Sequence, residues 1–475
     1  MTTLVRPARL LGLALGAAQC ARFSDERYVI DDAWISFRTA RNVVEHGIFT
    51  FDATQPPVEG VTNLLWTLLS ALGLLIWPDL EPALFARVLG GALYFGVLWI
   101  GAGLGARDAA SPVSGALVTG VLLGAAGNLA FHALSGLESG LYLFLWALSL
   151  QLVGAAPRPW LLGLTLAALG MTRPEGVLLG GLTLGWAAWR WNRAAAPALV
   201  LWTLGIAGME AFRLTTFGAW VPNTFHAKPP NMAGGWTYLA RFALAVGVVG
   251  PVGAIVAARK CEALRVPLAV AGVLLAGAVW SGGDWMPGYR RATEAYFVLA
   301  WGAGVAFAGV GTRWAGGLAL VAMLGGSGVM AWRGEDAGRY GQIVYGQVGS
   351  LLAASPGVDT VAAADIGRLG WYYPGSILDL GGLTDARWAA AGGWDEAYFR
   401  ERDPDVLLVV TGAPMRPDLK EPAGVRGYER RPLAFVRAEG GYHLRAVIPL
   451  PGLTQMAVIA RDDVVLSEEI WGPRP

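Results

Sequence analysis

The stretch Tyr28-Val-Ile-Asp31-Asp32-Ala-Trp-Ile-Ser-Phe-Arg38 places two adjacent carboxylates soon after the first apolar segment of the chain. Ionised side chains are costly beside lipid, so a pair of acids next to a membrane segment indicates a site. A structural interpretation is also open. Acids in the first turn of a helix are favoured by the helix dipole, and Asp31 and Asp32 could simply cap the helix that follows. The stretch alone does not decide between them.

The composition is that of a membrane protein. Of the 475 residues, 55% are hydrophobic and 15% are charged, and the mean hydropathy is +0.47. A soluble protein carries about 25% charged residues. The charges here are confined to short connections between long apolar runs, which predicts a polytopic α-helical membrane protein. The net charge of +1 indicates no nucleic-acid partner.

Twelve apolar segments are candidate membrane helices, at 6–23, 61–77, 84–104, 113–132, 141–154, 159–171, 177–189, 195–210, 238–258, 266–281, 293–311 and 314–331. Several are shorter than the ~20 residues that span a bilayer. Arg6 and Arg9 place the N-terminus in the cytoplasm. The number of crossings counted from the N-terminus and the number counted back from the later basic loops differ by one segment. We therefore predict about eleven crossings of a bacterial inner membrane.

Two modules are expected. Residues 1–333 form the membrane module, whose extracytoplasmic first loop at 24–60 carries an amphipathic helix in the membrane interface. From residue 334 to 475 the charges return, which predicts a soluble extracytoplasmic α/β domain. Short apolar runs predict its strands at 358–364, 405–411, 433–437 and 456–460, with helical stretches near 338–354 and 385–402.

On this topology the unusual polar residues share the outer side of the membrane. They are Asp31, Asp32, Arg38, Glu59, Asn63, Glu138, Arg173, Glu175, Asn223, His226, Lys228, Asp284 and Arg290. Each also has a structural interpretation. Asp284 and Arg290 could be an interfacial ion pair, Arg173 a charged helix end, Glu138 a turn residue and His226 a solvated side chain. Their common location favours one reaction centre at the outer surface.

These residue types suit the transfer of a group from a phosphate ester to a hydroxyl. One carboxylate can take the proton of the attacking hydroxyl. A second can hold a divalent cation (Mg, Mn or Ca) or position the acceptor. Arginine and lysine can stabilise the charge that grows on a departing phosphate. No Walker, Rossmann or zincin spacing occurs.

Several ordered motifs resemble those of GT-C glycosyltransferases, and in particular the family of the terminal β-arabinofuranosyltransferase of mycobacterial cell walls. The resemblance covers roughly residues 25–390. The motifs are Asp31-Asp32-Ala-Trp-Ile-Ser-Phe-Arg38, Glu59-Gly-Val-Thr62-Asn63, Ser135-Gly-Leu-Glu138, Thr172-Arg173-Pro-Glu175, Pro222-Asn223-Thr224 with Lys228, Gly283-Asp284-Trp-Met-Pro-Gly-Tyr-Arg290 and Asp379-Leu-Gly-Gly-Leu-Thr-Asp385.

The resemblance implies a membrane enzyme that moves a sugar from a polyprenyl-phosphate donor to a hydroxyl of a cell-envelope glycan or lipid, with inversion at the anomeric carbon. By motif position, Asp31 or Asp32 would be the general base, and the other would bind a metal ion or the acceptor. Arg173, Lys228 and Arg290 would contact the donor phosphate.

The sequence leaves two alternatives from other functional classes. A transporter or flippase of lipid-linked glycans needs polar groups near the middle of its membrane helices, whereas here they fall in loops or at helix ends. A non-catalytic assembly protein that binds glycan through its α/β domain would be expected to have lost the acidic pair. The sequence does not indicate the sugar, the acceptor or the linkage.

Overall fold

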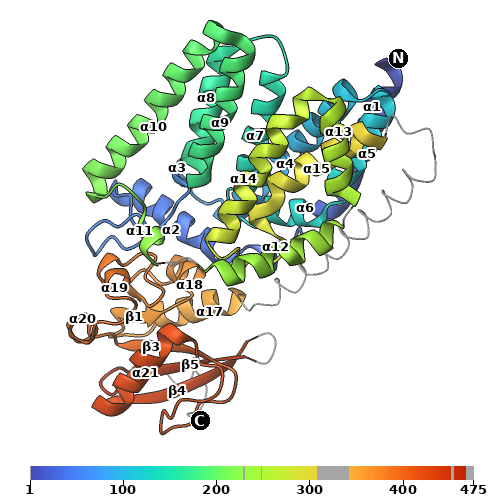
Figure 1. The fold of residues 1–475 in the computed structure, drawn as a ribbon. Helices are drawn as coiled ribbons and strands as arrows, with labels where there is room; N and C mark the ends of the chain where they lie inside the picture. Colours follow the sequence, from blue (N-terminus) through green and yellow to red (C-terminus); the bar gives the residue numbers. More distant parts are fainter. Residues whose placement is uncertain (1, 228–230, 248, 308–341, 451–453, 467–475) are drawn as a thin grey trace.

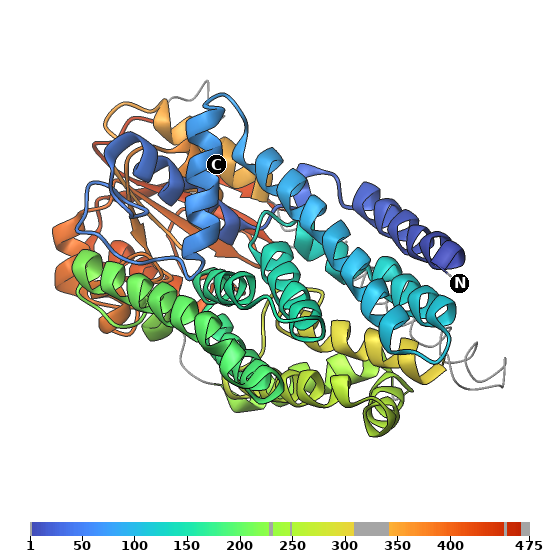
Figure 2. The same ribbon diagram turned by 90° about the horizontal axis from the view of Figure 1, so that it is seen from above.

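The computed structural model describes residues 2–227, 231–247, 249–307, 342–450 and 454–466. A helical bundle stands over a C-terminal domain that contains a β-sheet (Figure 1). Seen from above, helix α1 and the C-terminal domain lie toward opposite ends of the molecule (Figure 2). The predicted membrane segment at 314–331, the predicted boundary between modules at 333/334 and Lys228 lie outside the described residues.

The bundle is made of mostly apolar helices, several of which begin at a proline, a residue preorganised for the first helical position. They are α1 (Thr2–Arg22), α3 (Leu64–Ile76), α4 (Pro82–Asp108), α5 (Pro112–Ala125), α6 (Gly127–Leu134), α7 (Ser139–Val153), α8 (Pro159–Thr172), α9 (Pro174–Trp191), α10 (Ala196–Phe217), α12 (Met232–Val246), α13 (Val249–Lys260), α14 (Arg265–Trp280) and α15 (Thr293–Phe307).

Glycines let these helices approach closely. A Cβ added to Gly12 of α1 would lie 2.7 Å from the backbone oxygen of Gly120 in α5. One added to Gly105 of α4 would lie 2.5 Å from the backbone oxygen of Gly115. Small residues at such contacts are typical of helices that pack inside a membrane, where close van der Waals packing replaces the hydrophobic effect.

Three helical tracts of the described chain are long and apolar enough to cross a membrane: Pro82–Asp108, Pro174–Phe217 and Glu262–Trp280. Helices α5 and α6 make a fourth if they are one span, bent by 56° at their junction. Helices α3, α7 and α8 are apolar but shorter. The protein is thus a helical membrane protein, and the count of about eleven crossings stays a prediction.

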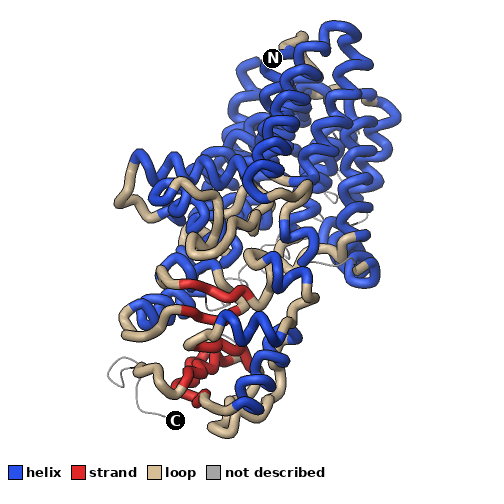
Figure 3. Tube along the Cα trace, turned by 90° about the vertical axis from the view of Figure 1, so that its left-hand side faces the viewer, coloured by secondary structure: helices blue, strands red, loops and turns tan. Residues whose placement is uncertain are grey.

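The C-terminal domain holds one five-stranded sheet, drawn in red in Figure 3, in the order β2-β1-β3-β5-β4. Strand β1 (Thr360–Ala363) pairs in parallel with β2 (Ser376–Asp379) and β3 (Val406–Thr411), whereas β5 (Gln455–Arg461) is antiparallel to β3 and to β4 (Tyr442–Pro449). Its helices are α17 (Gln342–Ala353), α18 (Gly367–Tyr372), α19 (Ala386–Ala390), α20 (Glu396–Arg402) and α21 (Gly427–Glu439).

The strand predicted at 433–437 was wrong, because these residues belong to α21. The buried residues of α21 are Glu429, Pro432, Leu433 and Val436, a spacing of three, one and three that puts them on one face of a helix. Strands β2 and β4 were not predicted. The helical stretch near 385–402 is confirmed as two short helices, α19 and α20.

Helix α2 (Asp31–His46) lies between the bundle and the C-terminal domain. Its location in the membrane interface stays a prediction, but part of its polar face is covered by α18 and the segment that follows. Arg38 donates to the backbone oxygens of Tyr373 (3.2 Å) and Gly375 (2.9 Å), and Arg41 donates to that of Trp371 (3.0 Å). The helix is therefore a platform on which the C-terminal domain docks.

Candidate active site

Asp31 caps a helix, but not its own. The N-cap of α2 is Ile30, whose side chain forms no capping hydrogen bond. The two carboxylate oxygens of Asp31 instead accept hydrogen bonds from the backbone N–H groups of Gly367 and Arg368, each at 2.8 Å. These groups begin α18, so Asp31 joins the first loop to the C-terminal domain. Burial, with Asp365 nearby, raises the pKa of Asp31 to about 7.

Asp32 faces a different environment. It is half-buried, whereas Asp31 is only 8% exposed. Its carboxylate lies within electrostatic reach of Arg290, which comes from the loop between α14 and α15. The two neighbouring acids therefore differ: Asp31 is held by backbone groups, whereas Asp32 is more exposed and lies within electrostatic reach of Arg290.

Arg173 lies at the centre of a charged cluster. Pro174 disfavours helical backbone at the preceding residue, so Arg173 is extended between α8 and α9. Its buried guanidinium lies 3.6 Å from Glu138 and 3.5 Å from Glu175. Asn63 donates to Glu138 at 3.0 Å, so the start of α3 joins the same cluster.

The loop between α14 and α15 supplies the remaining charges. Arg290 pairs with Asp284 at 2.8 Å, and Arg291 pairs with Glu175 at 3.0 Å. Burial alone would raise the pKa of Asp284, but Arg290, the backbone N–H of Met286 and Arg173 together outweigh burial and hold that pKa below its usual range. The loop turns sharply, with positive φ at Gly282, Gly283 and Gly288, and also at Tyr289.

The structure thus brings together eight of the predicted site residues: Asp31, Asp32, Asn63, Glu138, Arg173, Glu175, Asp284 and Arg290. It also adds residues that were not predicted as site residues. A small pocket is lined by Tyr142, Arg173, Glu175, Leu274, Arg291 and Glu294. One signal was available for Glu294, which stands alone near the start of an apolar segment and is buried in α15. The Tyr142 ring, under the Arg173 guanidinium at 5.2 Å, carries no such signal.

Four predicted site residues lie elsewhere, so the prediction of a single cluster was wrong for them. Arg38 docks the C-terminal domain, as described above. Glu59 pairs with Arg213 of α10 at 2.6 and 3.0 Å. Asn223, in α11 (Asn223–Ala227), donates to the backbone oxygens of Gly382 and Leu383 at 2.7 and 3.0 Å. His226 is exposed. Arg38 and Asn223 contact the C-terminal domain, and Glu59 contacts α10 within the bundle; spacing along the sequence reveals neither kind of contact.

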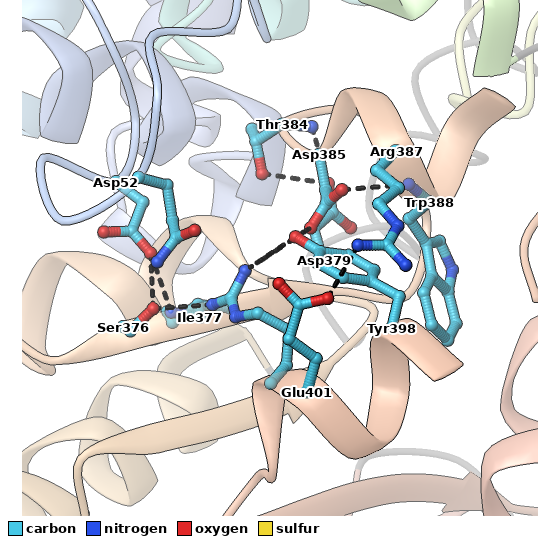
Figure 4. A network of polar contacts seen from close by, with 12 residues as sticks. Asp52, Ser376, Ile377, Asp379, Thr384, Asp385, Arg387, Trp388, Tyr398 and Glu401 are labelled. Atoms are coloured by element: carbon cyan, nitrogen blue, oxygen red, sulfur yellow. Dashed lines mark hydrogen bonds and ion pairs between the residues drawn. The ribbon is translucent and has the colours of Figure 1, made fainter. Parts of the chain in front are cut away.

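The motif from Asp379 to Asp385 is also structural (Figure 4). Asp379 accepts hydrogen bonds from the backbone N–H groups of Gly381 and Thr384, each at 2.8 Å, and burial raises its pKa to about 6. Asp385 caps α19 and accepts from the hydroxyl of Tyr398 at 2.8 Å. A Cβ at Gly60 would lie 2.5 Å from Thr384, so this turn packs against the first loop.

The same view shows a second contact between the first loop and the sheet (Figure 4). Asp52 accepts hydrogen bonds from the hydroxyl of Ser376 at 2.7 Å and from the backbone N–H of Ile377 at 3.2 Å. Arg402 donates to the same hydroxyl at 2.6 Å. The first loop is thus held by the start of β2 as well as by α18.

The donor set does not fit a divalent cation. Within the described residues no three side chains of His, Cys, Asp and Glu come together as metal ligands. Both oxygens of Asp31 accept backbone N–H groups, and Asp32 faces the cation Arg290. No step below is routed through a metal ion.

Comparisons with known proteins agree with this architecture. Residues 332–466 match the model of a domain of unknown function, DUF8728. The chain is similar in structure to ArnT from Cupriavidus metallidurans in the apo state, with a TM-score of 0.65 and 13% identity over 98% of this chain and 99% of that one. This chain has a GT-C fold.

A second similar structure is the archaeal oligosaccharyltransferase AglB from Archaeoglobus fulgidus, in complex with an inhibitory peptide and a dolichol-phosphate. The TM-score is 0.51 and the identity 10%, over 84% of this chain and 69% of that chain. No curated protein sequence matches this chain.

Proposed function

We propose that this protein is a membrane glycosyltransferase that moves a sugar from a polyprenyl-phosphate donor to a hydroxyl of a cell-envelope glycan or lipid. The observation that carries the proposal is the charged cluster at one end of the bundle, where Arg290 pairs with Asp284 beside the Glu138–Arg173 pair and Asp32 lies within electrostatic reach of Arg290. The GT-C fold supports it, because the similar AglB is an oligosaccharyltransferase that was solved with a dolichol-phosphate.

Asp32 is the better candidate for the general base. Each oxygen of Asp31 already accepts one backbone hydrogen bond and the residue is buried, so Asp31 is less accessible to an acceptor hydroxyl than the half-buried Asp32. In the proposed step Asp32 takes the proton of the acceptor hydroxyl, and the oxygen of that hydroxyl attacks the anomeric carbon. The bond from the anomeric carbon to the phosphate oxygen breaks, and polyprenyl phosphate leaves with inversion.

Arg173 and Arg290 are the candidates for the donor phosphate, with Arg291 beside them. Charge-assisted hydrogen bonds from guanidinium groups stabilise phosphate oxygens. Each arginine is paired with a carboxylate in this structure, so a bound phosphate would share or replace those partners. The role of Lys228 is a proposal that rests on the motif alone.

The location of the cluster favours an enzyme over a transporter. Asp32 lies in the first turn of α2, Glu138 precedes α7, Arg173 separates α8 from α9 and Arg290 precedes α15. All of these are helix ends on the side that faces the C-terminal domain. The basic residues at the N-terminus support an orientation with the N-terminus in the cytoplasm and the C-terminal domain outside. The sugar of the donor, a hexose or a pentose, is the question that the series of donors in the following test addresses.

The test neutralises the Asp284–Arg290 pair as a whole, because removing one partner would leave a buried charge unpaired. Protein in nanodiscs receives polyprenyl-phosphate arabinofuranose, mannose or glucose together with a hydroxyl acceptor, and the released polyprenyl phosphate is measured. We expect release by the wild type and its loss in the double variant Asp284→Asn/Arg290→Gln. The control is Arg400→Gln/Glu439→Gln, which neutralises an exposed pair in the C-terminal domain. Equal release by both double variants would contradict the proposal.

A further inference from the structure

Helix α3 buries its polar side chains and exposes apolar ones, the reverse of a helix that faces water. Thr67 and Ser70 are buried, with exposures of 0% and 2%. The exposed side chains of the helix are all large and aliphatic: Leu68 (39%), Leu72 (49%), Leu75 (65%) and Ile76 (53%). Their spacing of four, three and one puts them on one face of the helix, which we call the outer stripe. The pattern indicates that this side of α3 does not face water.

The opposite face of α3 holds the loop that carries Glu138. The indole N–H of Trp66 donates to the backbone oxygen of Gly136 at 2.9 Å, and the amide of Asn63 donates to Glu138 at 3.0 Å. The hydroxyl of Thr67 in turn donates to the side-chain oxygen of Asn63 at 3.0 Å. The inner face of α3 is therefore fixed against the charged cluster, and the outer stripe points away from it.

Both ends of α3 lie at the end of the bundle that faces the C-terminal domain. At the start, the side-chain oxygen of Asn63 lies 3.1 Å from the hydroxyl of Ser36 in α2, the helix on which that domain docks. At the end, a short connection leads to Glu81, the N-cap of α4. Glu81 is within electrostatic reach of Arg368 in α18 and of Glu26, which pairs with Arg368. The chain thus leaves α3 at the level where it entered.

The length of α3 agrees with this path. Its 13 residues span about 20 Å at 1.5 Å per residue, whereas the hydrocarbon core of a bilayer is about 30 Å thick. An upright helix of this length would end inside the core, far from the C-terminal domain. The contacts of Glu81 contradict that position.

Lipid is the partner that fits the outer stripe. The stripe continues through Trp77 (54% exposed) into Leu84 (43%) and Val88 (65%) of α4, a helix long and apolar enough to cross a membrane. Tryptophan is enriched where a membrane meets water, which suits Trp77 at the end of α3. A contiguous exposed apolar surface marks contact with a membrane or with another protein. Its continuity with a membrane helix favours the membrane.

We propose that α3 does not cross the membrane but lies in its plane, at the end of the bundle next to the C-terminal domain, with the outer stripe among the lipid acyl chains. The segment predicted at 61–77 is then the one by which the two counts of crossings differ. In-plane helices of this kind sit near the boundary between headgroups and acyl chains, so α3 holds the Glu138 loop at that depth. The inference does not depend on glycosyl transfer.

The test measures membrane depth at single nitroxide labels in nanodiscs. The two cysteines of the chain are replaced by serine, and single cysteines are introduced as Leu68→Cys, Leu72→Cys or Leu75→Cys. All three positions are exposed, so the labels leave the packing of the helix intact. Collisions of each label with oxygen, which concentrates in acyl chains, and with a water-soluble nickel chelate give its depth. We expect more collisions with oxygen than with nickel at all three positions, and depths at 68 and 75 that agree within about 3 Å; an upright helix would separate them by about 10 Å.

Matched labels on α4 and in the C-terminal domain calibrate the result. Leu84→Cys and Ala92→Cys, both exposed on α4, should differ in depth by about 10 Å, because eight residues of a crossing helix separate them. Lys420→Cys should collide mainly with nickel. A depth difference between 68 and 75 like that of the α4 pair would show that α3 crosses and would overturn the inference. Nickel collisions at 72 like those at 420 would place the stripe in water, and protection from both reagents would assign it to a protein partner; either result would overturn the lipid assignment.

Discussion

Asp31 and Asp32 differ more than their adjacency suggests. The sequence indicated that one of them would act on a hydroxyl, but it could not say which. That distinction depends on residues 367 and 368, more than 300 positions away in the chain, whose backbone N–H groups bind Asp31. The capping interpretation named the wrong helix, because Asp31 caps α18 and not α2. Asp32 is the proposed base.

Glu429 provides a test of how burial affects an ionisable side chain in the C-terminal domain. Burial raises the pKa of Glu429 to about 8, from 4.5 in the unfolded chain. Between these pH values the folded protein keeps a proton that the unfolded chain has lost. The contribution of Glu429 to stability is therefore complete below about pH 4.5 and is lost as the pH rises toward 8. In Glu429→Gln this loss should disappear, so the change in Tm between about pH 5 and about pH 8.5 should shrink.

The exposed acid Glu439 serves as the control for that measurement, since it lies in the same helix. Glu439→Gln should keep the pH dependence of the wild type. An unchanged pH dependence of Tm in Glu429→Gln would show that this carboxyl does not hold a proton in the folded state.

Helix α2 shows what pattern reasoning captures at the scale of an element. Its start, its end at Gly47 and its two faces follow from the spacing of apolar residues. What covers the polar face does not, because the partners are backbone carbonyls from another part of the chain. Strands β2 and β4 were missed for a different reason, namely that their apolar patterns are weak. Strand β2 has only four residues, and β4 is an edge strand with charged and half-exposed positions that weaken the apolar signal.

Arg38 gives the prediction for this element. Its guanidinium donates to two backbone carbonyls and lies 4.5 Å from the centre of the Phe51 ring. Arg38→Leu leaves both carbonyls without a buried partner, at a cost of about 1–3 kcal/mol each. We expect faster hydrogen exchange in α18 and in β2, while exchange in α4 is unchanged. Arg241→Leu, an exposed site on α12, is the control. Protection of α18 equal to that of the wild type would contradict docking through Arg38.

The whole molecule places its charged cluster between two modules. The sequence predicted a helical membrane protein with a C-terminal α/β domain and most members of the cluster, because acids and arginines at the ends of apolar helices are conspicuous. It could not predict the pairing, since Asn63, Glu138, Arg173 and Arg290 come from four separate connections. It also could not separate site residues from structural ones, as Arg38 and Glu59 show, because Asp32, Arg38 and Glu59 are all polar residues of the same first loop.

The topology can be tested at this scale by labelling. Cys20 and Cys261 are replaced by serine, and single cysteines are introduced as Lys420→Cys in the C-terminal domain and Arg193→Cys in the turn between α9 and α10. Both positions are exposed. In intact cells a membrane-impermeant maleimide should label position 420, and it should reach position 193 only after permeabilisation. The opposite labelling would contradict an extracytoplasmic C-terminal domain.

The comparison of Asp31→Asn with Asp32→Asn tests the central claim most directly, with release of polyprenyl phosphate and Tm measured on the same preparations. Asp32→Asn should lower kcat by about 10²–10⁴-fold, the usual contribution of a general base, with little change in Tm. Asp31→Asn should lower Tm, because an amide can accept only one of the two backbone hydrogen bonds, and it should retain turnover. The account would be contradicted if Asp32→Asn turned over at the wild-type rate, or if Asp31→Asn lost turnover while keeping the wild-type Tm.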